Sequence, residues 1–206
     1  MVRYTGPKNR IARRFGANIF GYARNPLLHK PNPPGMHGAR RKKKSDFGMQ
    51  LDEQQKLKAI YGMLPQKQLV RAYNVASRSK GNTLLVFMQR LECRLDNIVY
   101  RLKFAPTIFA AQQLVSHGHV LVDGKKVDRR SFLVEPEMTV SLKPQIQKLD
   151  WAKQAQASAA REIPEYLSAE EGKFSGKLLV RPETDQIPLP LPVNIALVCD
   201  FLAHIS

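Results

Sequence analysis

Basic side chains are the groups in this sequence whose type and spacing could do chemistry, and that chemistry is phosphate binding. The stretch SHGHVLVDGKKVD, from Ser116 to Asp128, changes from helical to strand-like spacing and places Lys125 and Lys126 after an Asp-Gly turn. Asp-Gly is a favoured dipeptide of two-residue hairpin turns. Lysine meets phosphate as a point charge, whereas the planar arginine fork donates two parallel hydrogen bonds. The stretch predicts a cationic hairpin, although two lysines on a turn are more often simply solvated.

Two helical patterns lead into this hairpin. In RLDNIVYRLKF (94–104), Arg94 and Arg101 are seven residues apart and share a face with Asn97, away from the apolar stripe. In TIFAAQQLVSHG (107–118), the last turn brings two histidines next to the first strand. We expect one concave edge for a polyanion, formed by the basic side chains of Arg94, Arg101, His117, His119, Lys125 and Lys126.

Positive charge is concentrated in the first fifth of the chain. Lysine and arginine number 33 against 17 acidic residues, for a formal net charge of +16. The first 44 residues carry 12 of these basic residues and no acidic one, and they end in the run Arg40, Arg41, Lys42, Lys43 and Lys44. Such charge usually indicates nucleic acid or an anionic membrane as partner. Few apolar residues here follow a period, so we expect an extended arm ordered mainly by what it binds.

Several classes of function lack the residues they need. The only cysteines are Cys93 and Cys199, too few for a disulfide framework or for a zinc site with four closely spaced ligands. The longest apolar runs, LLVFM and IALVC, are far short of a membrane span, and no apolar signal region opens the chain. No paired carboxylates, phosphate loop or nucleophile–histidine arrangement stands out. We expect a non-enzymatic protein of a reducing, cytosolic compartment.

The spacing of apolar residues predicts the helices and strands that must position the basic residues. Helical spacing covers 45–64, 65–79, 84–92, 94–104 and 107–118, and strand-like alternation follows at 120–122, 125–127 and 138–142. A further helix is expected at 151–160, and the last stretch fits helix or strand, with Pro192 favouring helix. Residues 92–150 would form a compact α+β unit. The expected core residues are Leu57, Ile60, Tyr61, Leu64, Leu95, Ile98, Val99, Leu102, Ile108, Ala111, Leu114 and Val115.

Two stretches resemble one family closely. RLDNIVYRLKFAPTIFAAQQLVSHGHVLVDGKKV is similar to the helix–helix–hairpin RNA-binding module named after bacterial ribosomal protein S4, which several families share. PPGMHGARRKKKSDFGMQLDEQQKLKAIYGML is similar to the segment before the helical domain of the S4 family itself. The order of arm, helical domain, module and C-terminal segment also matches, so the resemblance covers most of the chain and is weakest over the last 30 residues.

The resemblance implies an α+β fold in which an RNA-binding module of the alpha-L type, with a small antiparallel sheet, is inserted into a helical domain. The basic N-terminal arm would span 1–46. The helical domain would span 47–91 and be completed by 176–206, and the module with its extension would span 92–175. The final apolar stretch would thus return to pack on the helical domain.

The resemblance further implies a structural constituent of the small ribosomal subunit, cytoplasmic or in an organellar ribosome, with no cofactor. It would be a primary 16S rRNA-binding protein that nucleates assembly of the subunit body and contacts ribosomal protein S5. Arg40 to Lys44 would lie where mRNA enters its channel and contribute to translational accuracy. The positions expected to bind rRNA are Arg3, Arg10, Arg13, Arg14, His37, Arg94, Asn97, Arg101, Gln112, His117, His119, Lys125 and Lys126.

The sequence departs from the family pattern in two places. Many members carry four metal-binding cysteines near the N-terminus, whereas the first 92 residues here contain none, and His29 with His37 would be a poor site. We therefore expect a metal-free variant. The second module helix often has an arginine where this chain has Gln112, so a weaker amide hydrogen bond would replace one phosphate contact.

Two other classes of protein carry this module. Arg94-Leu95-Asp96 resembles the core motif of pseudouridine synthases, in which the aspartate is a nucleophile, but those enzymes need a large separate catalytic domain and different residues after the aspartate. A stand-alone RNA-binding factor that visits ribosomes would need only the module and a basic tail. The additional helical domain and the long arm favour a permanent ribosomal constituent.

Overall fold

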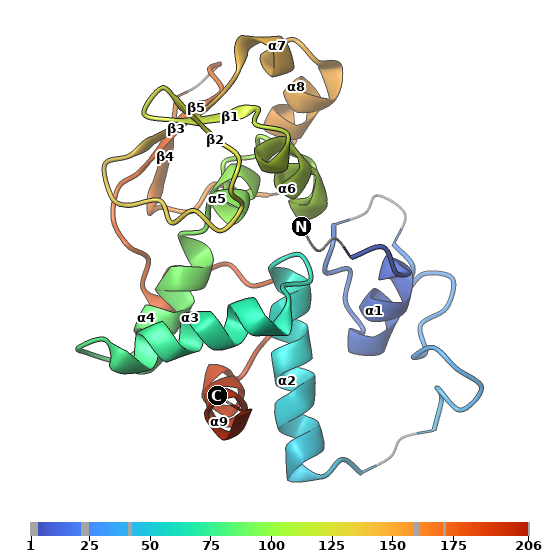
Figure 1. Ribbon diagram of the computed structural model, residues 1–206. Helices are drawn as coiled ribbons and strands as arrows, with labels where there is room; N and C mark the ends of the chain where they lie inside the picture. The colour runs from blue at the N-terminus through green and yellow to red at the C-terminus, as the bar shows by residue number, and fades with distance from the viewer. Residues whose placement is uncertain (1–3, 22–24, 41–42, 159–160, 171, 206) are drawn as a thin grey trace. The chain divides into compact units, whose positions relative to one another are not determined.

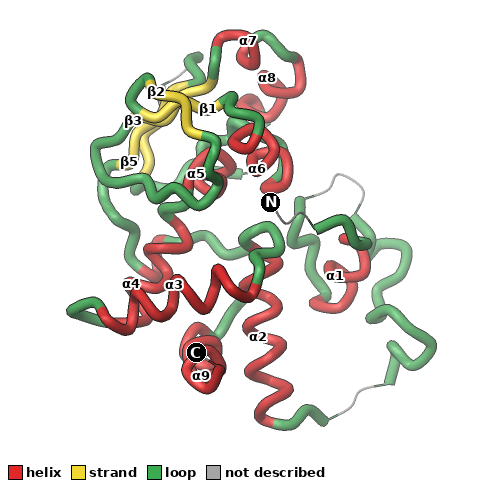
Figure 2. The backbone as a smooth tube through the Cα atoms, in the orientation of Figure 1, coloured by secondary structure: helices red, strands yellow, loops and turns green. Residues whose placement is uncertain are grey.

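The chain divides into two compact units. We call Met1–Leu84 with Leu189–Ser206 the helical unit, and Leu85–Pro188 the module unit; Figures 1 and 2 show the elements of each. The expected domain boundaries, with an arm at 1–46, a helical domain at 47–91 and 176–206, and a module at 92–175, stay predictions. The residues that this computed structural model describes are 4–21, 25–40, 43–158, 161–170 and 172–205.

Four helices make up the described part of the helical unit. They are α1 (Lys8–Phe15), α2 (Asp46–Ile60), α3 (Gln66–Arg78) and α9 (Ile195–Ile205). The apolar stripe expected after residue 45 is buried in full at Leu57, Ile60, Tyr61 and Leu64. The C-terminal stretch is a helix, as its proline favoured, and α9 packs against α2 and α3.

Helix α1 corrects one expectation about the arm. We expected an extended segment, but the arm contains this helix, and Ala12, Ile19 and Phe20 are buried. The Arg13 guanidinium closes the following loop by donating hydrogen bonds of 3.0 Å to the carbonyls of Lys30 and Asn32. The helix was missed because KNRIARRF has too few apolar residues to show a period.

The module unit combines short helices with a five-stranded antiparallel sheet. Helix α4 (Thr83–Glu92) leads into it, and the strands lie in the order β2-β1-β3-β5-β4. This is the α+β fold with a small antiparallel sheet that was predicted. The other elements are α5 (Leu95–Arg101), α6 (Ile108–Ser116), β1 (Val120–Val122), β2 (Lys125–Val127), β3 (Thr139–Leu142), α7 (Pro144–Gln147), α8 (Asp150–Ala157), β4 (Leu167–Ala169), β5 (Ser175–Leu178) and a 3-10 turn (Thr184–Gln186).

The predicted core and turns of the module are confirmed. The apolar stripes of α5 and α6 are buried in one cluster with the sheet. The Thr107 hydroxyl caps α6 by accepting a hydrogen bond of 3.2 Å from the Ala110 amide. Gly118 ends the helical segment with a φ of 68°, and Asp123 and Gly124 turn the hairpin with φ of 47° and 76°. Positive φ at both central residues is typical of the type I′ turn.

Strands β4 and β5 were not predicted. Proline-rich surroundings and the short sequences LSA and SGKL conceal them, and neither shows two-residue alternation. At Gly176 of β5, an added Cβ would lie 2.5 Å from a methyl of Leu102 and 2.9 Å from the Ser168 carbonyl oxygen. The strand can pack this tightly on α5 and pair with β4 because glycine has no side chain.

Both cysteines are buried thiols without a disulfide. Burial and the nearby carboxylates raise the pKa of Cys93 and that of Cys199 to about 11 each. Because the thiolate is the reactive form, we expect both to react with a thiol reagent at pH 8 far more slowly than a free cysteine. Denaturant should release two titratable thiols per chain. Rapid modification of either in the folded protein would contradict this burial.

Candidate nucleic-acid interface

The β1–β2 hairpin presents two lysines to solvent. The tip is held by Asp123, whose carboxylate accepts a hydrogen bond of 2.8 Å from the Thr139 amide of β3. Lys125 and Lys126 are both exposed. The Lys126 side chain lies against Gly118, so close that an added Cβ there would overlap it. The structure therefore brings the charged side chain of Lys126, on β2, next to the turn that ends α6.

His117 and His119 stand on either side of this turn. Their rings meet edge to face with centroids 6.0 Å apart. Partial burial lowers the pKa of His119, and the positive fields of His117, Lys143 and Lys126 lower it further. The structure therefore places the two histidines in the same region as the hairpin lysine Lys126.

Arg94 does not project into this region, which corrects the geometry expected from the sequence. It precedes α5 instead of lying within it, and it is only 7% exposed. Its Nε and Nη2 donate to the two carboxylate oxygens of Asp96 at 3.0 and 2.9 Å. Nε and Nη2 of Arg94 are thus both engaged inside the protein, so the expectation that this side chain faces a groove is wrong.

Arg101 is held inside the unit in a similar way. Its Nε donates to Glu92 at 2.6 Å, and its Nη1 donates to the Pro188 carbonyl at 2.9 Å. The Tyr166 hydroxyl donates to the same Glu92 oxygen at 2.6 Å. Burial, and then the charge of Glu92, raise the pKa of Tyr166. We call Glu92, Arg101 and Tyr166 the buried triad.

The two amide residues expected at the interface are buried as well. The Asn97 side chain donates to the Glu92 carbonyl at 2.9 Å. Gln112 lies between charged partners: its amide nitrogen is 3.4 Å from Asp96, and its oxygen accepts from Arg130 at 3.2 Å. These residues shape the module from within, and their expected contacts with rRNA stay predictions.

The arm residues differ in how far they are already engaged. Arg14 donates to Asp52 at 2.6 Å, and Lys44 bonds the same carboxylate. Burial alone would raise the pKa of Asp52, but these two cations hold it below its ordinary value. Arg10, His37, Arg40 and Lys43 are exposed, whereas Arg3, Arg41 and Lys42 lie outside the described residues.

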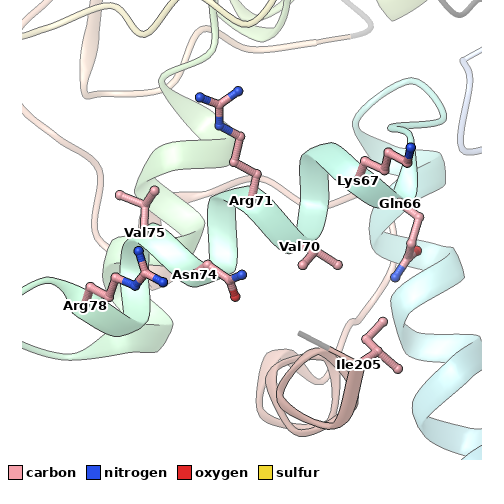
Figure 3. Close-up of a pocket in the computed structure, with 8 residues that line it drawn as sticks. All are labelled: Gln66, Lys67, Val70, Arg71, Asn74, Val75, Arg78 and Ile205. Carbon is pink, nitrogen blue, oxygen red and sulfur yellow. The ribbon is translucent and has the colours of Figure 1, made fainter.

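Sequence reasoning missed a basic face on α3. Lys67, Arg71 and Arg78 are exposed and lie four and seven residues apart, on one side of the helix. They line a groove of about 690 Å³ with Val70 and with Ile205 of α9. Figure 3 shows Val70 directed toward Ile205, and Lys67 and Arg71 directed away from it. The helical spacing of the three cations was the signal that could have found this face.

These α3 cations differ from others of the helical unit in having no acid beside them. Within the part of the chain that the structure describes, neither an ion pair nor a side-chain hydrogen bond engages Lys67, Arg71 or Arg78. Lys56, by contrast, pairs with Glu53 at 2.6 Å. The α3 face is therefore ready to receive anions.

The described residues offer little support for other kinds of site. Asp96, the counterpart of a pseudouridine synthase nucleophile, is 1% exposed and bound to Arg94. No three His, Cys, Asp or Glu side chains among the described residues lie close enough to hold a metal ion. Over the same residues, no helix combines the length and apolar character needed to cross a membrane.

Comparison with known proteins places these features in one family. Family models described as "Ribosomal protein S4/S9 N-terminal domain" and "S4 domain" match residues 3–92 and 93–140. Small ribosomal subunit protein uS4 of Protochlamydia amoebophila is 64% identical over 204 residues, covering 99% of both chains. The proteins of that name from Chlamydia trachomatis serovar D and Chlamydia pneumoniae are 61% and 58% identical, again over 99% of both chains. The chain therefore belongs to the family of small ribosomal subunit protein uS4.

Proposed function

We propose that the protein is a structural, non-enzymatic constituent of the small ribosomal subunit that binds 16S rRNA and nucleates assembly of the subunit body. The observation that carries this proposal is the 64% identity with a small-subunit protein over 99% of both chains. The match includes both the N-terminal domain and the RNA-binding module. The proposed place of action is the cytoplasmic ribosome.

Recognition would depend on phosphates and shape. Structured RNA is read largely through backbone and 2′-hydroxyl contacts, and exposed cations suit this task. The hairpin lysines, the two histidines at the end of α6 and the cations of α3 are the proposed phosphate contacts. Arg94 and Arg101, paired with Asp96 and Glu92, would instead hold the module in shape.

Two finer assignments belong to the same proposal. The segment Arg40 to Lys44 would contact mRNA where it enters the small subunit and so influence translational accuracy. Ribosomal protein S5 would be a neighbouring protein. Replacing the five basic residues of the segment by alanine should impair mRNA entry more than subunit assembly, and an assembly defect that appears first would overturn this division of roles.

Binding to RNA across a salt series tests the proposed phosphate contacts. Each contact contributes about 0.7–0.9 to the slope of log K against log salt. The proposed binding site is a junction of several 16S rRNA helices, and the test uses a fragment that contains it, the junction fragment. Lys125→Gln with Lys126→Gln should weaken binding to this 16S rRNA junction fragment and flatten the slope by about two contacts. Lys67→Gln, Arg71→Gln and Arg78→Gln together should flatten it by about three.

A control variant removes one positive charge elsewhere on the surface. Lys173 is exposed and pairs with Glu170, so Lys173→Gln should leave the slope unchanged. Unrelated structured RNA serves as the competitor. If both RNAs bind equally and lose affinity together as salt rises, specific rRNA recognition is refuted. An unchanged slope in either variant removes that group from the interface.

A visiting ribosome factor is the alternative function, because such factors carry the same module. Retention on small subunits distinguishes the two. We expect one protein per subunit to survive high-salt washing. A substoichiometric amount that salt removes would favour the visiting factor.

A further inference from the structure

A small cavity opens beside the histidine pair of the module unit. Its volume is about 290 Å³, and it lies between the end of α6 and the α7–α8 corner. Leu114 and Ile146, both mostly buried, form apolar walls together with Pro106. Drug-sized ligands usually occupy pockets of about 300–1,000 Å³, so this cavity matches a single planar ring system better than a larger ligand.

Three aromatic or heteroaromatic rings line the same cavity. Trp151 of α8 lines the cavity together with His117 and His119, and Trp151 is 37% exposed. A partly exposed tryptophan beside a cavity offers a flat apolar face, and among the described residues no aromatic ring or cation is stacked on Trp151. Aromatic faces of this kind stack on unpaired bases, whatever the sequence.

The surroundings of the cavity are positively charged. Lys143 and Lys126 are near enough that their charges, after burial and the neighbouring His117, lower the pKa of His119. The Lys143 amide donates a hydrogen bond of 3.0 Å to the His119 carbonyl, which fixes this segment beside the cavity. Among the described residues that line the cavity, none is acidic. A base that enters would therefore bring its phosphate toward cations.

We propose that this cavity binds one unstacked RNA base, with Trp151 as the stacking platform and the apolar walls covering its edges. The exposed amide of Gln113, which also lines the cavity, offers a donor and an acceptor to the base edge. The inference rests on the proposed rRNA binding and deepens it. The hairpin lysines hold the backbone, whereas the cavity holds a base that has left its helix, as single-stranded RNA elements allow.

Trp151 is the only tryptophan of the chain, so the emission of the full-length protein under excitation selective for tryptophan reports on this cavity. On addition of the 16S rRNA junction fragment, the emission should be quenched and should saturate together with binding measured by filter retention. Trp151→Ala should weaken binding about fivefold to 150-fold, the range measured for losing one base–aromatic stack. Trp151→Phe should retain most of the affinity.

The salt slope separates the stack from a phosphate contact. Trp151→Ala should leave the slope as in the parent protein, because no counterion is released at a stack, whereas the Lys125→Gln, Lys126→Gln variant should flatten it. Thermal unfolding of each variant checks that the module is intact. Binding without a change in emission, or full affinity in Trp151→Ala, would overturn the base site and leave rRNA binding standing. No retention of the RNA on the filter would overturn both.

Discussion

Replacing Glu92 by alanine should lower the free energy of unfolding by about 3–5 kcal/mol, the usual cost of removing one partner from a buried ion pair. Glu92 is fully buried and bonds both Arg101 and Tyr166 at 2.6 Å. Without it, the guanidinium and the phenol keep their buried positions but lose their common acceptor. Urea unfolding of the full chain, followed by circular dichroism, measures the loss.

Two controls test whether the buried triad accounts for this loss. Tyr166→Phe removes one hydrogen bond and should cost about 1–3 kcal/mol, because hydrogen bonds to charged groups exceed neutral ones. Glu162 is exposed, and Glu162→Ala should change stability by no more than about 0.5 kcal/mol. A Glu92→Ala variant as stable as Glu162→Ala would show that the triad contributes nothing.

Asp96→Ala should be destabilising by a similar amount, about 3–5 kcal/mol. It would leave the Arg94 guanidinium, in a residue that is 7% exposed, without the carboxylate that accepts from its Nε and Nη2. Replacing the pair together, as Arg94→Met with Asp96→Leu, should recover most of this loss, since apolar residues of similar size often substitute for a buried ion pair without cost.

The same double variant decides the role of Arg94 in RNA binding. If Arg94 is a structural residue, the double variant should bind the rRNA fragment with the slope of the parent protein. A slope flatter by about 0.7–0.9 would return Arg94 to the interface, as its position in the sequence first suggested. The two readouts, stability and slope, are independent of each other.

Local periodicity explains why much of the fold was predictable. Apolar stripes at helical spacing identified the buried faces of α2, α5 and α6, and the Asp-Gly dipeptide identified the hairpin. These signals need only neighbouring residues. Short segments that were missed, among them α1, β4 and β5, contain too few apolar residues to show a period and take their form from tertiary contacts.

The candidate site was predictable only where exposure follows from the local pattern. Lysines after a tight turn must face solvent, and the structure exposes Lys125 and Lys126. The direction of Arg101 depends on Glu92 and on the carbonyl of Pro188, which is 87 residues away in the chain. No spacing rule reveals such a partner. The basic face of α3, by contrast, was visible as a repeat and was overlooked.

The place of β5 in the sheet has a consequence for where the module can be truncated. The S4 domain match ends at residue 140, inside β3, whereas β3 needs β5 on its other side, and β5 in turn pairs with β4. A segment cut at that limit would expose an open sheet edge, which invites pairing with other chains. The segment that the S4 domain model matches and the complete sheet are therefore different lengths of chain, because the sheet includes β4 and β5 and extends to Leu178.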